Sequence, residues 1–190
     1  MSNKNLVLTA LAMVFLFSNC TNAQTKQTGK EMKTLVTYFS ATGTTKAAAE
    51  KLAKITDSDI YEIKPETLYT DADLDWHDKQ SRSTIEMQDK SSRPEIADKN
   101  VKIENYDTIY IGFPIWWYIA PTIINTFLES YDFSGKTVIL FATSGGSGFG
   151  KTLENLKGSC SSNTTIKEGK VFIGNPTEAD IETWVKSMKN

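Results

Sequence analysis

The sequence has little cysteine and histidine and no excess of positive charge. Two cysteines and one histidine among 190 residues exclude a disulfide-rich scaffold and a histidine-rich metal site. The 21 basic residues are outnumbered by 23 acidic ones, which excludes a nucleic-acid-binding protein that depends on bulk positive charge. No stretch is long and apolar enough to predict a transmembrane span. The remaining composition, with 39% hydrophobic residues, is that of one compact globular domain.

The N-terminus has the pattern of an export signal. Lys4 precedes an apolar run from Leu6 to Phe17, and small polar residues follow. This order is typical of a secretory signal peptide, and cleavage after Ala23 would remove residues 1–23.

A second interpretation of the same region makes Cys20 the lipidated N-terminus of a bacterial lipoprotein, anchored by its lipid. Either interpretation predicts an exported protein, periplasmic or lipid-anchored at the cell envelope. Residues 24–32 are polar and are expected to form a flexible tether. The folded domain would then comprise residues 33–190.

From residue 33 onward, strand-like runs alternate with helical patterns, which predicts an α/β fold with a parallel sheet. Strands are expected at 34–39, 60–63, 107–112, 138–142 and 170–174. The run VILFA at 138–142 is apolar throughout, as expected for a central parallel strand covered on both faces. Five strands suit a doubly wound sheet of order 2-1-3-4-5 with helices on both faces.

Helices are expected between these strands and after the last one. One begins with Pro121, which suits a first helical turn, and the closing helix begins with a capping box at Thr177 and Asp180. Residues 64–100 do not fit the alternation, because they are polar and too long for a simple connection. A short helix is expected there, at about 77–89.

Three loops with unusual sequences follow the first, third and fourth predicted strands. They are SATGTT at 40–45, FPIWWY at 113–118 and TSGGSGFG at 143–150. In an open parallel sheet, ligands bind beyond the carboxyl ends of the strands, where the strand order reverses. The three loops are therefore expected to meet at one edge of the sheet and form a ligand site.

The first loop has the features of a phosphate-binding turn. Ser40, Thr42, Thr44 and Thr45 can each donate a hydroxyl to an anion, and Gly43 permits a tight turn. The helix that follows would direct unpaired N–H groups toward the same anion. The alternative is a helix N-cap alone, for which one such hydroxyl would be enough.

The second loop offers planar faces at Trp116, Trp117 and Tyr118 beside the rigid Pro114, which suits stacking on a flat heterocycle. The alternative is that the tryptophans only cover the core. The third loop has no large side chain between residues 144 and 148, so its backbone could approach a ligand closely. Its alternative is an ordinary glycine-rich turn.

Residues Gly145–Thr152 also match the spacing G-x-x-x-x-G-K-[ST] of a P-loop nucleotide hydrolase. No apolar strand downstream ends in an aspartate that could hold magnesium. A nucleotide hydrolase therefore stays an alternative to the hypothesis that the three loops form one ligand site.

In this order and spacing, the three loops resemble those of the flavodoxin family, and the resemblance covers residues 33–190. It implies non-covalent FMN. The phosphate would be bound by the first loop, at Ser40, Thr42, Gly43, Thr44 and Thr45. The ring would lie between the other two loops, at Pro114, Ile115, Trp116, Trp117, Ser144, Gly145 and Gly146. Trp117, rather than Trp116, is expected against the ring or its ribityl chain.

The resemblance implies a protein that carries electrons or a flavin-dependent reductase, with an unidentified redox partner or small-molecule electron acceptor. No catalytic side chain and no metal are implied, because the flavin supplies the redox chemistry. A further hypothesis is a flavin-free module that binds a partner protein through residues 64–100. The acidic cluster Asp71, Asp73, Asp75 and Asp78 surrounds Leu74 and Trp76. It would steer a basic partner, cover the flavin and shape a substrate site, or only be solvated, and His77 is expected at the surface.

Overall fold

The computed structural model describes residues 33–188. The predicted signal peptide, tether and lipidation site at Cys20 lie outside these residues. Along the chain, the elements are β1 (Thr34–Tyr38), α1 (Thr44–Thr56), β2 (Asp59–Glu62), α2 (Arg82–Gln88), a 3₁₀ turn (Ile103–Asn105), β3 (Thr108–Pro114), α3 (Ile123–Glu129), β4 (Thr137–Ser144), α4 (Thr152–Lys157), β5 (Thr165–Ile173) and α5 (Glu178–Ser187).

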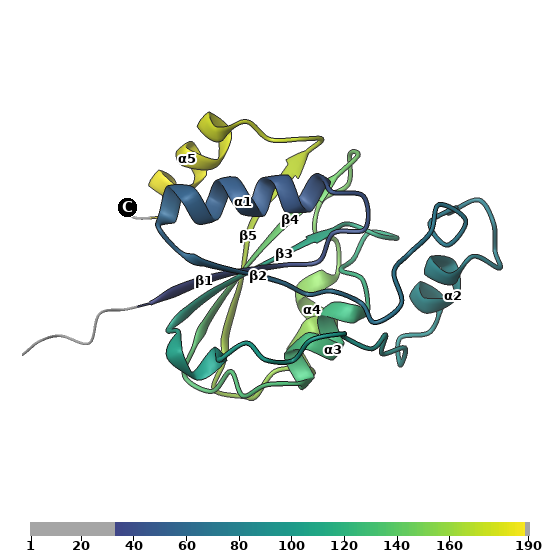
Figure 1. The fold of residues 1–190 in the computed structure, drawn as a ribbon, viewed down its shortest axis with the longest axis horizontal. Coiled ribbons are helices and arrows are strands. Elements are labelled where there is room, and N and C mark those ends of the chain that lie inside the picture. The colour runs from purple at the N-terminus through teal and green to yellow at the C-terminus, as the bar shows by residue number, and fades with distance from the viewer. Residues whose placement is uncertain (1–32, 189–190) are drawn as a thin grey trace, which may run out of the picture. The chain divides into compact units, whose positions relative to one another are not determined.

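The strands form one five-stranded sheet of order β2-β1-β3-β4-β5, and every pair is parallel. Helices α1 and α5 cover one face, and α3 and α4 cover the other (Figure 1). The predicted doubly wound α/β fold and its strand order are therefore confirmed. Because the order reverses between β1 and β3, the loops after β1, β3 and β4 lie at one edge.

Each face of the sheet has its own buried core. On one face, Val36 and Phe141 pack with Leu52 of α1 and Trp184 of α5. The other core is larger and joins the opposite sheet face to α3 and α4; its fully buried aromatic residues are Phe39, Phe113, Phe127 and Phe133. The predicted capping box is present, since Thr177 and Asp180 exchange both of its hydrogen bonds at the start of α5.

Several predicted boundaries were wrong: β3 and β4 each extend two residues further, to Pro114 and Ser144, and three other elements differ more. Strand β5 begins at Thr165, not at 170, because its first half is a polar, exposed edge and Gly169 interrupts the pattern where the β4–β5 register shifts. Helix α2 spans seven residues, shorter than the expected 77–89, because aspartate turns precede it. Helix α3 begins at Ile123, so Pro121 precedes the helix and does not lie in its first turn.

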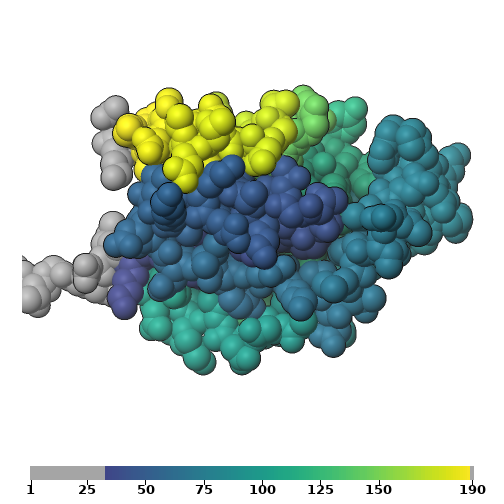
Figure 2. Space-filling model, turned by 45° about the horizontal axis from the view of Figure 1, so that its top comes forward, coloured from purple at the N-terminus to yellow at the C-terminus, as the bar shows by residue number. Residues whose placement is uncertain are grey.

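Residues 64–100 leave the sheet after β2 and return before β3, and they project beyond the carboxyl ends of the strands (Figures 1 and 2). The two ends of the segment pair as a short antiparallel ladder. The Glu66 N–H donates to the Glu95 carbonyl at 2.8 Å, and the Ala97 N–H donates to the Lys64 carbonyl at 2.9 Å. The segment is thus a loop closed at its base.

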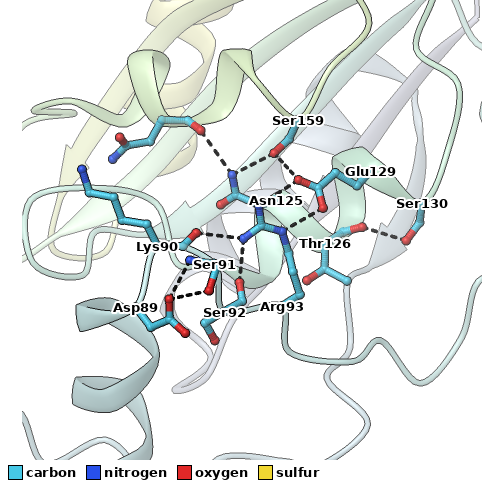
Figure 3. Close-up of polar contacts among 11 residues, drawn as sticks. Asp89, Lys90, Ser91, Ser92, Arg93, Asn125, Thr126, Glu129, Ser130 and Ser159 are labelled. Atoms are coloured by element: carbon cyan, nitrogen blue, oxygen red, sulfur yellow. Dashed lines mark hydrogen bonds and ion pairs between the residues drawn. The ribbon is translucent and has the colours of Figure 1, made fainter.

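A second anchor holds the returning end of the segment against α3 (Figure 3). The Arg93 guanidinium donates to both carboxylate oxygens of Glu129, at 2.8 and 2.9 Å. Ser159 donates to Glu129 at 2.7 Å, and Asn125 donates to Ser159 at 3.0 Å. Two-pronged arginine–carboxylate pairs fix orientation as well as distance, so this network sets the position of the segment on the helical layer.

Candidate functional site

The N-terminus of α1 has open backbone donors. Gly43 is the N-cap residue with φ of +91°, and no side chain caps the helix. Its own N–H is held by the Ser40 hydroxyl at 3.1 Å, so the free donors lie further along the first turn. That turn contains no acidic side chain. Unpaired N–H groups and the positive end of the helix dipole therefore face outward together.

The four hydroxyls of the first loop divide into two pairs. Ser40 is engaged with Gly43, and Thr45 is buried with its hydroxyl 2.7 Å from that of Thr143 at the end of β4. Thr42 is exposed and Thr44 is half-buried. Neither of these two has a hydrogen-bond partner for its hydroxyl within residues 33–188. The Thr45–Thr143 bond joins the first and third loops, and Thr42 and Thr44 remain available to an anion.

The second loop makes a tight reversal with two aromatic residues at its centre. Trp116 and Ile119 exchange both backbone hydrogen bonds at 3.0 Å. Between them, Trp117 and Tyr118 have φ of 45° and 67°. Bulky residues rarely adopt positive φ, and each such conformation costs about 1–3 kcal/mol. The surrounding structure must hold this turn in place, as it often does at ligand sites.

The two tryptophans have different surroundings. The Trp116 ring packs edge-on against Phe39 and Tyr69, with centroids 5.5 and 5.3 Å apart, so it is tied to the core. Trp117 is 39% exposed and lines a cavity. The geometry thus favours Trp117 as the ring that is free to stack on a ligand, in line with the expectation from the sequence, which stays a prediction.

The aromatic turn is braced by the third loop. Gly150 has φ of +53°, and a Cβ at this position would lie 2.2 Å from the Tyr118 carbonyl oxygen. The second glycine of the P-loop-like motif therefore has a packing role. Helix α4 begins only at Thr152, whose hydroxyl is buried and has no hydrogen-bond partner within residues 33–188. With Gly150 packed against Tyr118 and α4 starting only at Thr152, residues 145–152 do not support the nucleotide hydrolase alternative.

The remainder of the third loop is held by Ser144, the last residue of β4. The Ser144 hydroxyl accepts hydrogen bonds from the N–H groups of Gly146 and Ser147, at 3.1 and 2.7 Å. Gly145 and Gly146 are exposed, with open space at their Cβ positions. Of this loop, Ser147 lines the cavity, whereas Ser144, Gly145 and Gly146 are not among its lining residues. Their predicted contact with a flavin ring stays a prediction.

The loops enclose a cavity of about 520 Å³, a size typical of small-molecule sites. Its lining is mostly apolar and aromatic and comes from four parts of the chain: Ala41 and Thr42 of the first loop, Pro114 to Tyr118 of the second, Ser147 of the third, and Leu74, Trp76 and Ser83 of the 64–100 segment. The sequence offered the stretch around Leu74 and Trp76 as one possible cover of the site, but Ser83 was not expected there. The apolar Leu74 and Trp76 amid aspartates were the only available signal.

The acidic cluster builds turns. The Asp73 carboxylate accepts from the Thr70 N–H and hydroxyl at 2.8 and 2.7 Å, and these bonds lower the pKa of Asp73. Asp75 accepts from the His77 N–H at 2.9 Å. His77 is exposed, as expected. Within residues 33–188, no group of His, Cys, Asp and Glu side chains could hold a metal ion. In the same range, no helix is long and apolar enough to span a bilayer.

Comparison with known protein families assigns the chain to a family. A family model described as Flavodoxin matches residues 33–188, which is most of the chain and all of its described part. The chain belongs to the flavodoxin family. The five-stranded parallel sheet of order 2-1-3-4-5 is that of the flavodoxin-like fold.

Solved structures and one curated relative agree with this assignment. A Bacteroides uniformis protein assigned as a flavoprotein is 50% identical, with a TM-score of 0.77, covering 82% of this chain and 98% of its own. A Lactobacillus acidophilus flavoprotein in complex with FMN is 27% identical, with a TM-score of 0.59, covering 81% of this chain and 99% of its own. Rat NAD(P)H dehydrogenase [quinone] 1 is 26% identical over 139 residues; these make up 59% of this chain and about half, 51%, of the rat enzyme.

Proposed function

We propose that this chain binds FMN non-covalently at the edge formed by the three loops and uses it in electron transfer or in a flavin-dependent reduction. The observation that carries the proposal is the uncapped N-terminus of α1, where two free threonine hydroxyls adjoin an aromatic cavity. The FMN bound to the Lactobacillus flavoprotein, which covers 81% of this chain, supports the choice of cofactor.

The first loop fits a phosphate group. Thr42 and Thr44 have unengaged hydroxyls, and the first turn of α1 supplies N–H donors with no acidic side chain to repel an anion. Ser40, Gly43 and Thr45 would hold the turn in the shape that presents these donors. The phosphate would be bound by neutral donors and the helix dipole, with no arginine required.

The cavity fits a planar ring. Pro114, Ile115 and Trp117 supply apolar and aromatic walls, and Trp116 supports them from the core side. FMN, when bound, supplies one- and two-electron redox chemistry. These walls would shield a bound ring from water and disfavour negative charge on it, so the protein would set the potential. No acid or base among the lining side chains is needed for electron transfer.

The same site serves a carrier or a reductase, and the similarity to a rat NAD(P)H dehydrogenase supports oxidoreductase chemistry. The electron donor and acceptor would be a redox partner or a small molecule. We propose in addition that the protein acts outside the cytoplasm, from the signal-like sequence of residues 1–23.

Comparing FMN with riboflavin isolates the phosphate contribution. For a Thr42→Ala/Thr44→Ala double variant, two hydrogen bonds to a charged group are lost, about 3 kcal/mol in total. We expect FMN affinity to fall roughly a hundredfold while riboflavin affinity is unchanged, measured by quenching of flavin fluorescence. Thr183→Ala, an exposed threonine on α5, is the matched control. Equal effects on both flavins, or none on FMN, would remove the phosphate role of this loop.

A further inference from the structure

Three aromatic rings from distant parts of the chain meet behind the second loop. Phe39 directly follows β1, Tyr69 belongs to the 64–100 segment and Trp116 lies in the second loop. The ring centroids of Trp116 are 5.5 Å from those of Phe39 and 5.3 Å from those of Tyr69, and the Phe39 and Tyr69 centroids are 5.7 Å apart. Each ring thus contacts both others, at separations typical of favourable aromatic pairs. These three residues are called the aromatic triangle below.

One corner of the aromatic triangle reaches the cavity. Trp116 lines it, whereas Phe39 and Tyr69 are not among the lining residues. Phe39 is buried and Tyr69 is half-buried. A ligand in the cavity is therefore reached by Tyr69 only through Trp116.

Trp116 forms the base of the strained turn in the second loop. It exchanges both backbone hydrogen bonds with Ile119 at 3.0 Å, and Trp117 and Tyr118 between them have positive φ. Such a backbone conformation persists only where the surrounding structure holds it. The contact between Tyr69 and Trp116 is one of the contacts that hold it, and it comes from outside the three loops.

Tyr69 is itself held at its face and at its hydroxyl. The Arg82 guanidinium lies 4.1 Å from the centre of the Tyr69 ring, and the Tyr69 hydroxyl donates to Glu86. Arg82 also donates to Glu86 at 2.6 Å and to the Thr67 carbonyl at 2.7 Å. Burial and the bond to Glu86 raise the pKa of Tyr69, so the hydroxyl stays a donor. The ring therefore keeps one orientation against Trp116.

The segment that carries Tyr69 is also fixed at its base. The Glu66 N–H donates to the Glu95 carbonyl at 2.8 Å, three residues before Tyr69. The Arg93–Glu129 pair holds the returning end against α3. Tyr69 thus reaches Trp116 from an anchored segment, and a contact that is formed in advance costs little conformational entropy when a ligand binds.

We propose that Tyr69 is a positioning residue for the flavin: through Trp116 it fixes the second loop, and with it the face that Trp117 offers to the ring. The inference rests on the proposed FMN site. It gives residues 64–100 a part in setting the affinity and the redox potential of the flavin through a residue that does not touch it. A loosened wall admits water, which stabilises negative charge on the reduced ring more than it stabilises the neutral oxidised ring. Loss of the Tyr69 ring therefore weakens oxidised FMN more than reduced FMN and makes the midpoint potential more positive.

Two substitutions of Tyr69 in the full chain test this role. Tyr69→Leu removes the ring and keeps an apolar side chain, and Tyr69→Phe keeps the ring and removes only the hydroxyl. We expect Tyr69→Leu to weaken oxidised FMN and riboflavin equally, roughly tenfold, because two aromatic contacts are lost and the phosphate loop is unaltered. The affinity for reduced FMN should fall less, so the midpoint potential from a dye-coupled titration should rise. Tyr69→Phe should restore most of both quantities.

Tyr106→Leu is the matched control. Tyr106 is also half-buried against the core, and its hydroxyl also donates to a carboxylate, that of Asp59, at 2.8 Å. It precedes β3 and so lies at the amino end of the strands, away from the three loops. The control should lose stability in urea while the affinity for both flavins and the potential stay unchanged. If Tyr69→Leu gave this same result, its role would be structural only and the inference would be overturned.

The remaining outcomes separate the two proposals. If Tyr69→Leu weakened FMN but not riboflavin, the residue would act on the phosphate loop, and the inference would fail while FMN binding stands. If the unaltered chain bound neither flavin, the proposed function would fail and the inference with it. Circular dichroism shows whether each variant is folded. Should Tyr69→Leu not fold, Arg82→Met removes the guanidinium from the Tyr69 ring and leaves the ring in place. We expect it to raise the potential by a smaller amount, and an unchanged potential would overturn the inference.

Discussion

Replacing Gly150 by alanine tests how the aromatic turn is held. An alanine at φ of +53° costs about 1–2 kcal/mol for the left-handed backbone. Its Cβ would also lie 2.2 Å from the Tyr118 carbonyl oxygen, a separation that folded proteins do not show. Overpacking of this kind typically costs about 1–3 kcal/mol. We therefore expect Gly150→Ala to lower the free energy of unfolding by about 2–5 kcal/mol and to displace the Trp117–Tyr118 turn.

The assay is urea unfolding of the FMN-free protein, followed by FMN titration of each folded variant. Gly148→Ala is the control in the same loop, because its Cβ would have no neighbour within 4 Å and its φ is ordinary. The control should change the free energy of unfolding by less than about 1 kcal/mol and leave FMN affinity intact. If Gly150→Ala were as stable as Gly148→Ala, the third loop would not brace the aromatic turn, and this part of the site would be wrongly described.

The remaining predictions concern a charge pair, the P-loop-like motif and the thiol. The hydrogen bond from Arg93 is the main reason that the pKa of Glu129 lies below its ordinary 4.5. The ionised Glu129 carboxylate therefore stabilises the fold above pH 4.5, and this stabilisation is lost as the pH falls through the lowered pKa. The urea midpoint should be higher at about pH 6 than at about pH 3, and Glu129→Gln should remove the share of that difference that Glu129 contributes. Lys151→Ala should leave FMN affinity unchanged, and ATP binding that disappears in this variant would instead support a nucleotide site. Burial raises the pKa of Cys160 to about 11, so iodoacetamide at about pH 8 should label its peptide far more slowly in the native protein than in urea, as mass spectrometry would show.

The sheet and the place of the site could be predicted from the sequence because both depend on local patterns. An uninterrupted apolar run such as 138–142 indicates a central parallel strand, and β4 is that strand. Once the strands are in order 2-1-3-4-5, topology alone brings the loops after β1, β3 and β4 together. The capping box of α5 could also be predicted, because its two residues lie three positions apart in the sequence.

The details that make the site depend on contacts between distant residues, and these leave no local pattern. The hydroxyl of Thr45 is engaged because Thr143 lies opposite it, 98 positions later in the chain. The left-handed turn at Trp117 depends on Gly150 in another loop. The place of Ser83 could not be predicted for the same reason, because this residue lies at the cavity only where the contacts of Tyr69 and the base of the 64–100 segment hold it.

The two proposals give the three loops and the 64–100 segment separate roles. In this arrangement, the loops after β1, β3 and β4 hold FMN, and Tyr69 of the segment holds Trp116 in place. An electron carrier needs only the three FMN loops for contact with its cofactor. The residues that the 64–100 segment adds to the cavity would therefore distinguish a reductase from a carrier. Replacing Tyr69 by leucine changes the contribution of the segment, and the double variant of Thr42 and Thr44 changes that of the first loop.

A crystal structure of the protein with FMN tests the central claim most directly. The account predicts that phosphate oxygens lie within hydrogen-bond distance of the Thr42 and Thr44 hydroxyls and of N–H groups in the first turn of α1, with the ring against Trp117. A phosphate found elsewhere on the protein, with these hydroxyls facing solvent and α1 uncapped, would contradict it.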